Sequence, residues 1–415
     1  MIVEAHPPVR YRGRTYEADK QFFAGTHRAM PPEETLERIR PHLGLAGITR
    51  VADITGLDTV GIPVAVAMRP ASGTLAVEGG KGVSLAAAMT SAAMEAIERF
   101  VGEKQMPGEV RGTVDDVSDR LPVPAEQFPL FRYAAVAHHR PYAWTRMWNL
   151  LDDAEYLVPR EFVVMPTGDL SARSSVPWAP SSNGLASGNH LPEAICAALY
   201  EVIERDATSC WQVAHDRGEP WLVIEPDTIE GTAILDVLET LDRAGVDAQI
   251  AWCPTDVGVP TCLAYIFDRR PGIGIYKGYG CHLDPEIAMV RAVTEAVQSR
   301  TIFVAGARDD IMRPTYEAMK RGDVVWSDDL RRTAQRYSLS EIPNRSTGSF
   351  HGDIAVMLAL LERAGFEHVL VRELEASEFE ASVARVFVPG LEPYRFPWSA
   401  TGARALQFDP NAVVG

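Results

Sequence analysis

Three stretches of the chain follow one pattern: Ala92-Ala-Met-Glu-Ala-Ile-Glu-Arg99, Ala198-Leu-Tyr-Glu-Val-Ile-Glu-Arg205 and Ala292-Val-Thr-Glu-Ala-Val-Gln-Ser299. The first acid of each copy is Glu95, Glu201 or Glu295. The copies lie roughly a hundred residues apart, which is too far for a solenoid, whose repeats are about 20–50 residues long. The pattern therefore predicts an internally repeated α/β unit with one such helix in each copy.

The second polar position of each copy comes three residues after the first, at Glu98, Glu204 and Gln298. Residues that are three apart lie on the same face of a helix. Each predicted helix therefore presents a pair of oxygen-bearing side chains on one side.

These acids have two interpretations. A single Glu-x-x-Glu-Arg stretch is typical of a solvated helix surface, on which the acids pair with Arg99 or Arg205. Three related copies favour the other interpretation, because Ala, Met, Leu, Val and Ile surround the acids, and partly buried carboxylates persist only when paired or bound to metal. Mg²⁺ prefers oxygen ligands and commonly bridges carboxylates to nucleotide phosphates. Together with the Gln298 amide, the acids predicted to hold two Mg²⁺ ions are Glu95, Glu98, Glu201, Glu204 and Glu295.

Local signals place the ends of the three helices. Ser84 is a suitable N-cap for a helix over Leu85 to Phe100, since its hydroxyl can accept from a free amide of the first turn. In the second helix, Pro192 suits the first turn. The third helix is predicted to begin at Asp284-Pro285-Glu286, a cap followed by a proline, and to continue to about Val304.

The segments between the helices are less regular. Gly61 to Arg69 is an apolar, strand-like run, and Glu78 to Ser84 is expected to form a glycine-rich turn. Within that turn, Gly79-Gly-Lys-Gly82 either cradles a phosphate with backbone N–H groups and Lys81 or is purely structural, since it lacks the spacing of a P-loop. Ser340 to Asp353 is predicted to be an exposed loop.

Other candidate groups give weaker signals. Asn189 and Glu193 either contact a ribose or phosphate and a metal, or cap the second helix, and both possibilities stay open. We find no G-x-S-x-G elbow and no convincing Cys/His pair for nucleophilic catalysis. His138 and His139 are expected to be a surface or packing feature rather than a metal site.

Composition limits the class of partner. The chain has 415 residues, of which 46% are hydrophobic, so it can bury a large core. It carries 40 Lys plus Arg against 56 Asp plus Glu, for a formal net charge of −16. This balance offers no general attraction to phosphate backbones or anionic lipid, and we expect neither a nucleic-acid nor a membrane partner.

The cysteines and termini indicate a compartment. Five cysteines without CxxC spacing argue against a disulfide framework and against a zinc site. The N-terminus has no apolar core of signal-peptide length, and no run of some 18 apolar residues occurs. We therefore expect a cytoplasmic protein.

Taken in order, these features resemble the YcaO family. The resemblance rests on the following stretches: Gly25-Thr-His-Arg28 with Pro32-Glu-Glu-Thr-Leu-Glu-Arg38, Asp53-Ile-Thr-Gly-Leu-Asp58, Lys81-Gly82, Ser91-x-x-x-Glu95-x-x-Glu98-Arg99, Asn189-x-x-x-Glu193, Glu201-x-x-Glu204-Arg205-Asp206 and Glu295-x-x-Gln298. It implies an α/β YcaO-type fold, in which internally related helix-plus-sheet units form one compact catalytic body. The expected domain is a single one over residues 1–415, with sub-regions at about 1–111, 112–283 and 284–415.

The resemblance also implies roles for individual residues. The five acids become metal ligands or their immediate supports, and Glu98, Glu204 and Arg205 are the expected catalytic residues. The residues expected to bind the nucleotide cofactor ATP are Arg28, Thr35, Lys81, Ser91, Asn189, Glu193 and Gln298.

Members of this family use ATP to phosphorylate the oxygen of a peptide amide while a nucleophile adds to its carbonyl carbon. We expect this chain to form an azoline ring or a macrocyclic amidine in a ribosomally made precursor peptide. The first alternative is thioamide formation with a sulfide donor and a TfuA-like partner protein. Further alternatives are an ATP-dependent ligase or kinase that acts on a small molecule, and a non-enzymatic nucleotide-binding scaffold, which the full set of acids disfavours.

The chain differs from one common form of the family. We expect no fused leader-binding domain before the catalytic region, and the residues from Glu392 to Gly415 contain no PxPxP. We therefore expect the enzyme either to recognise its peptide alone or to need a separate recognition or TfuA-like protein. A homodimer is also possible.

Overall fold

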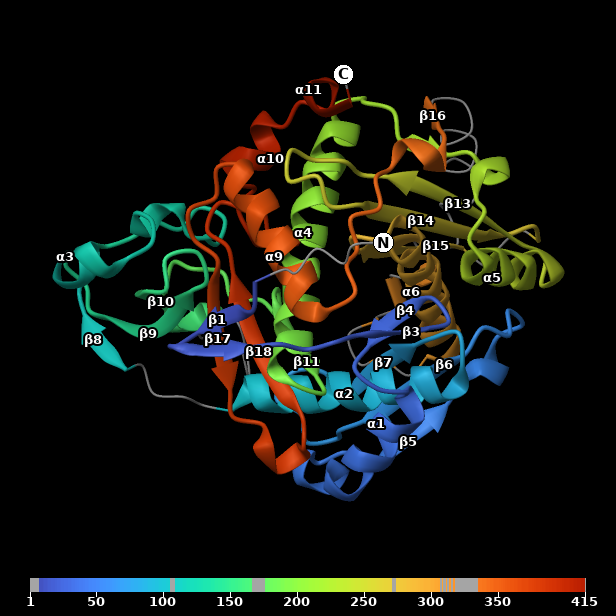
Figure 1. The fold of residues 1–415 in the computed structure, drawn as a ribbon, viewed down its shortest axis with the longest axis horizontal. Coiled ribbons are helices and arrows are strands. Elements are labelled where there is room, and N and C mark those ends of the chain that lie inside the picture. Colours follow the sequence, from blue (N-terminus) through green and yellow to red (C-terminus); the bar gives the residue numbers. More distant parts are fainter. Residues whose placement is uncertain are drawn as a thin grey trace. The chain divides into compact units, whose positions relative to one another are not determined.

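The structure is a computed structural model that describes residues 7–104, 109–165, 176–270, 274–306, 308, 311, 313–314, 316–317 and 335–414. The chain forms two compact units that are discontinuous in sequence (Figure 1). Unit 1 comprises residues 1–20, 97–213 and 347–409, and unit 2 comprises residues 21–96, 214–346 and 410–415. The division falls inside the helices α2 (Leu85–Glu103) and α4 (Leu191–Asp216). The expectation of a single catalytic domain with three consecutive sub-regions stays a prediction.

Unit 2 is built on a five-stranded sheet with the order β15-β14-β13-β12-β16. The strands are β12 (Leu222–Ile224), β13 (Val246–Trp252), β14 (Thr261–Asp268), β15 (Ile275–Cys281) and β16 (Gln335–Tyr337). All neighbours are antiparallel except β12 and β16, which are parallel. The central strand β14 is buried at its first six positions, so both of its faces are covered.

Helix α6 (Pro285–Ala305) organises this unit. It packs against β14 and β15, against the neighbouring helix α5 (Thr232–Arg243), and against β7 of a second sheet. That sheet has the order β5-β6-β7, with β5 (Arg50–Asp53), β6 (Val64–Met68) and β7 (Val77–Lys81). Because α6 is covered on several sides, it is apolar almost all round, as buried helices are.

Unit 1 contains a six-stranded sheet with the order β10-β9-β17-β18-β11, in which β8 also pairs with β9. The strands are β8 (Val110–Gly112), β9 (Tyr142–Asn149), β10 (Glu155–Pro159), β11 (Leu185–Gly188), β17 (Leu370–Leu374) and β18 (Ser382–Phe387). Aromatic rings fill one part of its core, where Phe162 stacks on Phe128 and on Phe387 with centroid distances of 5.5 and 5.0 Å. Stacked and edge-on ring pairs of this kind add to the stabilisation that burial provides.

Further hairpins and helices complete the two units. In unit 1 they are the hairpin of β1 (Val9–Tyr11) and β2 (Arg14–Tyr16), and the helices α3 (Val114–Val117), α9 (Phe350–Arg363) and α10 (Ala403–Gln407). In unit 2 they are the hairpin of β3 (Gln21–Phe23) and β4 (Thr26–Arg28), and the helices α1 (Pro32–Ile39) and α11 (Asn411–Val414).

One local arrangement occurs three times: a glycine-bearing strand leads directly into a helix that packs back on it. The pairs are β7 with α2, β11 with α4, and β15 with α6. A Cβ atom on Gly80 of β7 would lie 2.2 Å from the carbonyl oxygen of Ala88 and from the backbone N of Ala92. A Cβ atom on Gly278 of β15 would lie 2.3 Å from the carbonyl oxygen of Ala292. Backbone touches backbone at these points, so both the strand and the helix need their smallest residues.

The structure confirms the three helices expected from the repeated pattern. The hydroxyl of Ser84 accepts from the backbone N of Ala87, and Asp284 accepts from the backbone N of Glu286, so both expected caps form. The second helix extends to Asp216, whereas the sequence predicts its end at about Cys210. These ends follow from local hydrogen bonding, which is why sequence signals locate them.

Two expected segments are wrong in part. Residues 78–81 are not a turn but most of strand β7, because their glycines serve close packing rather than a change of direction. The expected loop over Ser340 to Asp353 ends early, since Ser349 caps α9 and both Phe350 and Asp353 are buried in its first turn. The first six residues, part of the N-terminus over which no signal peptide is expected, lie outside the described ranges.

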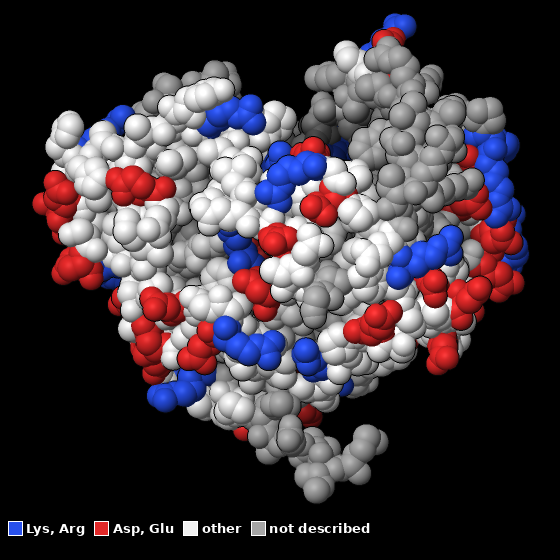
Figure 2. Space-filling view, turned by 90° about the horizontal axis from the view of Figure 1, so that it is seen from above, with Lys and Arg blue, Asp and Glu red and all other residues white. Residues whose placement is uncertain are grey.

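Charged residues lie on the surface drawn in Figure 2, and the five cysteines lie in the interior. Lys and Arg lie interspersed with Asp and Glu over the face drawn in Figure 2. All five cysteines are buried and free of disulfides, and burial raises the pKa of Cys196, Cys253 and Cys262. Among the described residues, no helix combines the length and the apolar character needed to cross a bilayer.

A buried ion pair joins two parts of unit 2. Arg300 on α6 donates to both carboxylate oxygens of Asp58, at 2.7 and 3.1 Å, and to Asp268 at 3.2 Å. The exposed fractions of the three side chains are only 1%, 5% and 1%. Asp58 closes the Asp53–Asp58 stretch, so this stretch is tied to the end of α6.

The first prediction tests the close packing of strand on helix. We expect Gly80→Ala to destabilise the protein by about 1–3 kcal/mol, because the added methyl group meets backbone atoms that cannot yield. Gly56→Ala is the matched control, since a Cβ there meets nothing within 4 Å, and it should change stability by less than about 0.5 kcal/mol. Urea unfolding of both variants measures the difference, and equal stability would show that β7 and α2 can separate at little cost.

The second prediction concerns Asp58. We expect Asp58→Asn to cost about 3 kcal/mol, the lower end of the range for breaking a buried pair, because Asp268 still compensates part of the Arg300 charge. Asp53→Asn in the same stretch is the control, since Asp53 is exposed and accepts a local bond from the backbone N of Thr55. Thermal melting compares the two, and a similar loss in both would contradict a special role of the buried pair.

Candidate functional site

Acids from two helices lie on one side of the unit 1 sheet. Glu98 on α2 accepts a 3.3 Å bond from the hydroxyl of Ser187 on β11. Glu201 on α4 and Glu98 both act electrostatically on Arg385 of β18. Both carboxylates are half-buried rather than exposed. Two of the predicted acids and a guanidinium group therefore gather in unit 1, which disfavours the solvated-surface interpretation.

Arg385 is a fully buried cation. Strand pairing sets it opposite Leu185 of β11, and its guanidinium donates to the carbonyl oxygens of Phe162 and Ser181 at 2.6 and 2.5 Å. Burial lowers the pKa of Arg385 to about 10, although the charges of Glu201 and Glu98 act to raise it. These hydrogen bonds of Arg385 go to carbonyls, and its charge partly balances that of the two acids.

Glu204 and Arg205 lie on the next part of α4. The Glu204 side chain is 5% exposed, and its carboxylate is 4.0 Å from the guanidinium of Arg205. Arg205 in turn lies over the ring of Tyr394, 5.3 Å from the ring centroid. This cation–π contact restricts the orientation of the guanidinium.

Asn189 and Glu193 meet at the start of α4. The backbone N and the side-chain amide of Asn189 both donate to the same oxygen of Glu193, each at 2.9 Å. The backbone N of Glu193 donates to the ring of His190 at 3.2 Å. These contacts close the first turn of the helix as a cap does, and the role of both residues toward a nucleotide stays a prediction.

In unit 2, three predicted residues gather around β7. Lys81 at the end of β7 pairs with Glu295 of α6 at 2.5 Å, and both side chains are about a quarter exposed, at 23% and 24%. Gln298 lies one turn further along α6, with its side-chain amide against Gly79. The structure therefore brings a lysine together with an acid and an amide that lie more than 200 residues further along the chain.

The other predicted residues of unit 2 lie on neighbouring elements. Ser91 and Glu95 are half-buried on α2. Arg28 ends β4 and donates to the carbonyl of His27 at 2.8 Å, while Thr35 is buried on α1. The hydroxyl of Thr90 on α2 donates to the carbonyl of Pro32, which fixes the start of α1 on α2.

Sequence reasoning missed several residues that lie beside the predicted ones. They are Ser187, which donates to Glu98, Arg385, on which Glu98 and Glu201 act electrostatically, and Tyr394, over which Arg205 lies. Asp206, which follows Arg205 in the motif, received no role although it anchors Glu392 and Arg404. Arg385 gave one usable signal, because a single charge within Val383-Ala-Arg-Val-Phe387 interrupts an apolar strand, and a buried charge needs partners. The other three depend on long-range pairing that no local pattern reveals.

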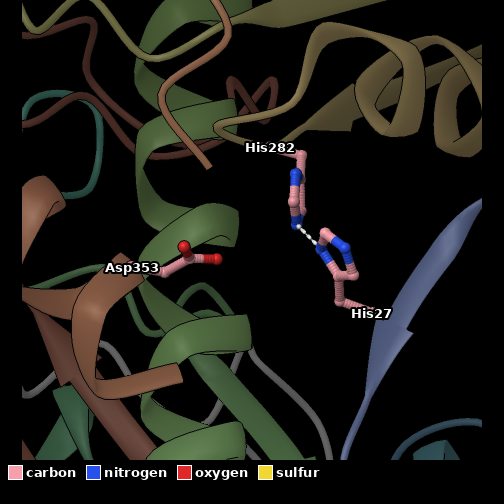
Figure 3. Close-up of side chains that lie close together, drawn as sticks. All are labelled: His27, His282 and Asp353. Carbon is pink, nitrogen blue, oxygen red and sulfur yellow. Dashed lines mark hydrogen bonds between the residues drawn. The ribbon is translucent and has the colours of Figure 1, made fainter. Parts of the chain in front are cut away.

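Histidines form one close pair in unit 2. Figure 3 shows His27 of β4 and His282 pointing toward one another, with ring nitrogens 3.4 Å apart. His282 also accepts from the backbone N of Asp284 at 2.9 Å and so helps to set the start of α6. Asp353, also labelled in Figure 3, belongs to unit 1, where it pairs with Lys20 and accepts from Tyr200 and Thr347.

His138 behaves as expected of a surface residue. Its ring contacts Asp115 and Glu126, and about half of its side chain is exposed, at 48%. The hydrogen bond to Glu126 raises the pKa of His138 above its usual value.

Comparison with known proteins gives the family. Residues 79–392 match the family model described as YcaO cyclodehydratase, ATP- and Mg²⁺-binding. An uncharacterised protein in the tfuA 3′ region of Rhizobium leguminosarum bv. trifolii is 34% identical over 383 residues, which covers 88% of this chain and 88% of that protein.

Two solved structures share the fold. YcaO from Methanopyrus kandleri, bound with AMPPCP and Mg²⁺, is 25% identical, with a TM-score of 0.70 over 92% of this chain and 98% of that chain. A heterocyclase in complex with substrate and cofactor is 20% identical, with a TM-score of 0.77 over 94% of this chain. This chain spans about half of that heterocyclase, 55% of its length.

The match of the family model covers most of the chain and includes all three copies of the repeated pattern. The α/β architecture and the cofactors expected from the sequence, ATP and Mg²⁺, are those of the matched family. The chain belongs to the YcaO family of ATP-dependent enzymes.

Proposed function

We propose that this enzyme uses Mg·ATP to phosphorylate the oxygen of a peptide backbone amide and so forms an azoline ring or a macrocyclic amidine in a ribosomally made peptide. The gathering of Glu98 and Glu201 beside the buried Arg385 carries the proposal. Keeping the two carboxylates half-buried costs folding free energy, and binding a cationic ligand offsets that cost. Membership of a family of ATP- and Mg²⁺-binding cyclodehydratases supplies the chemistry that such a site serves.

The donor set fits the cofactor. The acids proposed as ligands offer only carboxylate oxygens, the type that Mg²⁺ prefers, and no thiol belongs to the set. In the proposal the metal ligands are Glu95, Glu98, Glu201, Glu204 and Glu295. The residues proposed to contact ATP are Arg28, Thr35, Lys81, Ser91, Asn189, Glu193 and Gln298.

The side chains would act mainly through charge and position. Arg205, oriented by Tyr394, would place a positive charge beside the transferred phosphoryl group, and Glu204 would hold that guanidinium in place. Lys81, which now neutralises Glu295, would be drawn partly toward phosphate oxygens. Fixed charges of this kind stabilise a transition state without reorganising.

ATP supplies the phosphoryl group that turns a poor leaving group, the amide oxygen, into a good one. A Cys, Ser or Thr side chain or an N-terminal amine of the peptide adds to the carbonyl carbon, and phosphate then leaves with the former amide oxygen. The balance is one ATP consumed, with ADP and phosphate formed and one water equivalent lost from the peptide.

Thioamide formation is the second candidate. One observation favours it: a relative that is 34% identical is described by its position in a tfuA 3′ region. A neighbouring TfuA-like protein would then deliver sulfide as the nucleophile, and the product would exchange oxygen for sulfur instead of losing water.

The third prediction follows the oxygen atom. With ¹⁸O in the amide of a peptide that the enzyme turns over, we expect the label in inorganic phosphate, together with ADP. Mass spectrometry of phosphate and peptide measures this and also separates the two candidates, since ring or amidine formation loses water and thioamide formation gains sulfur. Label that stays in the product peptide, or the formation of AMP, would contradict amide O-phosphorylation.

The fourth prediction tests the acids. Glu98→Gln and Glu204→Gln keep size but remove a charge, so we expect turnover to fall on the order of 100-fold and more Mg²⁺ to be needed for ATP binding. Glu103→Gln, on the same helix as Glu98 and outside the proposed site, is the control and should keep near-normal turnover.

Single-turnover rates and calorimetric titration of ATP at several Mg²⁺ concentrations provide the measurement, beside a melting curve for each variant. If the acids only pair with surface arginines, each change should cost at most about 1 kcal/mol of stability and leave turnover intact. That outcome would refute the metal-ligand assignment.

A further inference from the structure

A row of aromatic rings lies next to the proposed catalytic residue Arg205 in unit 1. Tyr394, Phe396 and Trp398 occupy alternate positions of one segment, and neighbouring ring centroids are 4.9 and 4.6 Å apart. The planes of the last two rings are nearly parallel, at 12°. We call these three residues the aromatic row.

The inner end of the row touches the proposed site and the outer end faces solvent. Arg205 lies over Tyr394, which is half-buried, while 44% of Trp398 is exposed. A large exposed aromatic side chain on a folded surface commonly marks an interaction site when it is continuous with others. The row therefore forms a path from the Glu204–Arg205 pair to the surface of its unit.

The backbone under the inner end of the row is anchored to α4. The buried Asp206 accepts from the backbone N of Glu392 at 2.9 Å and holds Arg404 of α10 at 2.7 and 2.9 Å. The hydroxyl of Ser209 donates to the carbonyl of Pro393 at 2.8 Å. Asp206 directly follows Arg205 in sequence, so one turn of α4 fixes both the catalytic guanidinium and the start of the row.

The outer end is fixed as well. The hydroxyl of Ser399 accepts from the backbone N of Phe396 at 3.1 Å, and the carbonyl of Trp398 accepts from the backbone N of Arg132 at 2.8 Å. Ser399 also bridges to Phe131. A platform that is already rigid loses little conformational entropy when a ligand binds, and aromatic rings offer large contact areas with few rotatable bonds.

We propose that the aromatic row binds the substrate peptide next to the amide that is activated, and that it selects aromatic or proline side chains there. This inference rests on the proposed function, because that function requires a peptide chain beside Arg205. Ring faces stack on aromatic side chains, and proline packs flat against them. The row thus supplies specificity for the residues that flank the reacting amide.

The fifth prediction tests binding without turnover. The probes are short fluorescein-labelled peptides of Gly and Ser that carry aromatic residues, prolines or neither, and anisotropy gives Kd for the full chain. We expect peptides with aromatic residues or prolines to bind roughly tenfold more tightly than the plain Gly/Ser peptide. Trp398→Ser should abolish this preference, and Trp398→Phe should retain it.

Tyr133→Ser is the matched control, because Tyr133 is a highly exposed aromatic residue of the same unit, at 96%, and lies outside the row. It should bind all peptides as the wild type does, and melting curves show that each variant is folded. Three results would overturn the proposal: no preference in the wild type, an unchanged preference in Trp398→Ser, or a Trp398→Ser variant that weakens Mg·ATP binding or alters the oligomeric state while peptide binding is kept.

The two proposals fail separately. If ¹⁸O reaches phosphate but Trp398→Ser keeps its peptide preference, the aromatic row is not the peptide platform and amide activation stands. If the peptide preference depends on Trp398 but no label reaches phosphate, the row is a peptide site and amide O-phosphorylation is wrong.

Discussion

The close approach of a strand backbone to a helix backbone is the constraint on which the rest of this structure depends. Gly80 lies against Ala88 and Ala92, and Gly278 lies against Ala292, with no room for a Cβ atom on the strand. The alanine that opens the repeated pattern is fully buried in each of the three helices. In two of the helices this alanine meets the strand glycine, so the same packing sets the direction of the acid three residues later, Glu95 on α2 and Glu295 on α6, both in unit 2.

The same rule explains what the sequence could and could not predict. The helices with their Ser84 and Asp284 caps were predictable, because a cap is a local hydrogen bond within a few residues. Strand order was not, since β17 and β18 lie far along the chain from β9 and β11, with which they share a sheet. Residues 78–81 were misassigned because glycine serves turns and close packing alike, and only the partner helix distinguishes the two uses.

In the candidate site, too, local features were predictable from the sequence and long-range contacts were not. Acids with a helical repeat were recognisable from the sequence. The place of Arg385 depends on its pairing opposite Leu185, and local periodicity cannot predict a contact between strands about two hundred residues apart. Its burial nevertheless has a clear electrostatic consequence. The guanidinium donates to two backbone carbonyls, and its charge partly balances that of Glu98 and Glu201.

Asp206 extends this logic from the acids to the final segment of unit 1. It is wholly buried, and its two oxygens are shared between the backbone of Glu392 and the side chain of Arg404. Glu392 in turn accepts from the backbone N of Gly402 and of Ala405, and burial raises the pKa of its carboxyl group. The segment that carries Tyr394 is therefore held by Asp206, which lies on the same helix as Arg205. A helix that supplies acids, a guanidinium and the anchor of its aromatic support keeps their spacing constant, since all move with one rigid element.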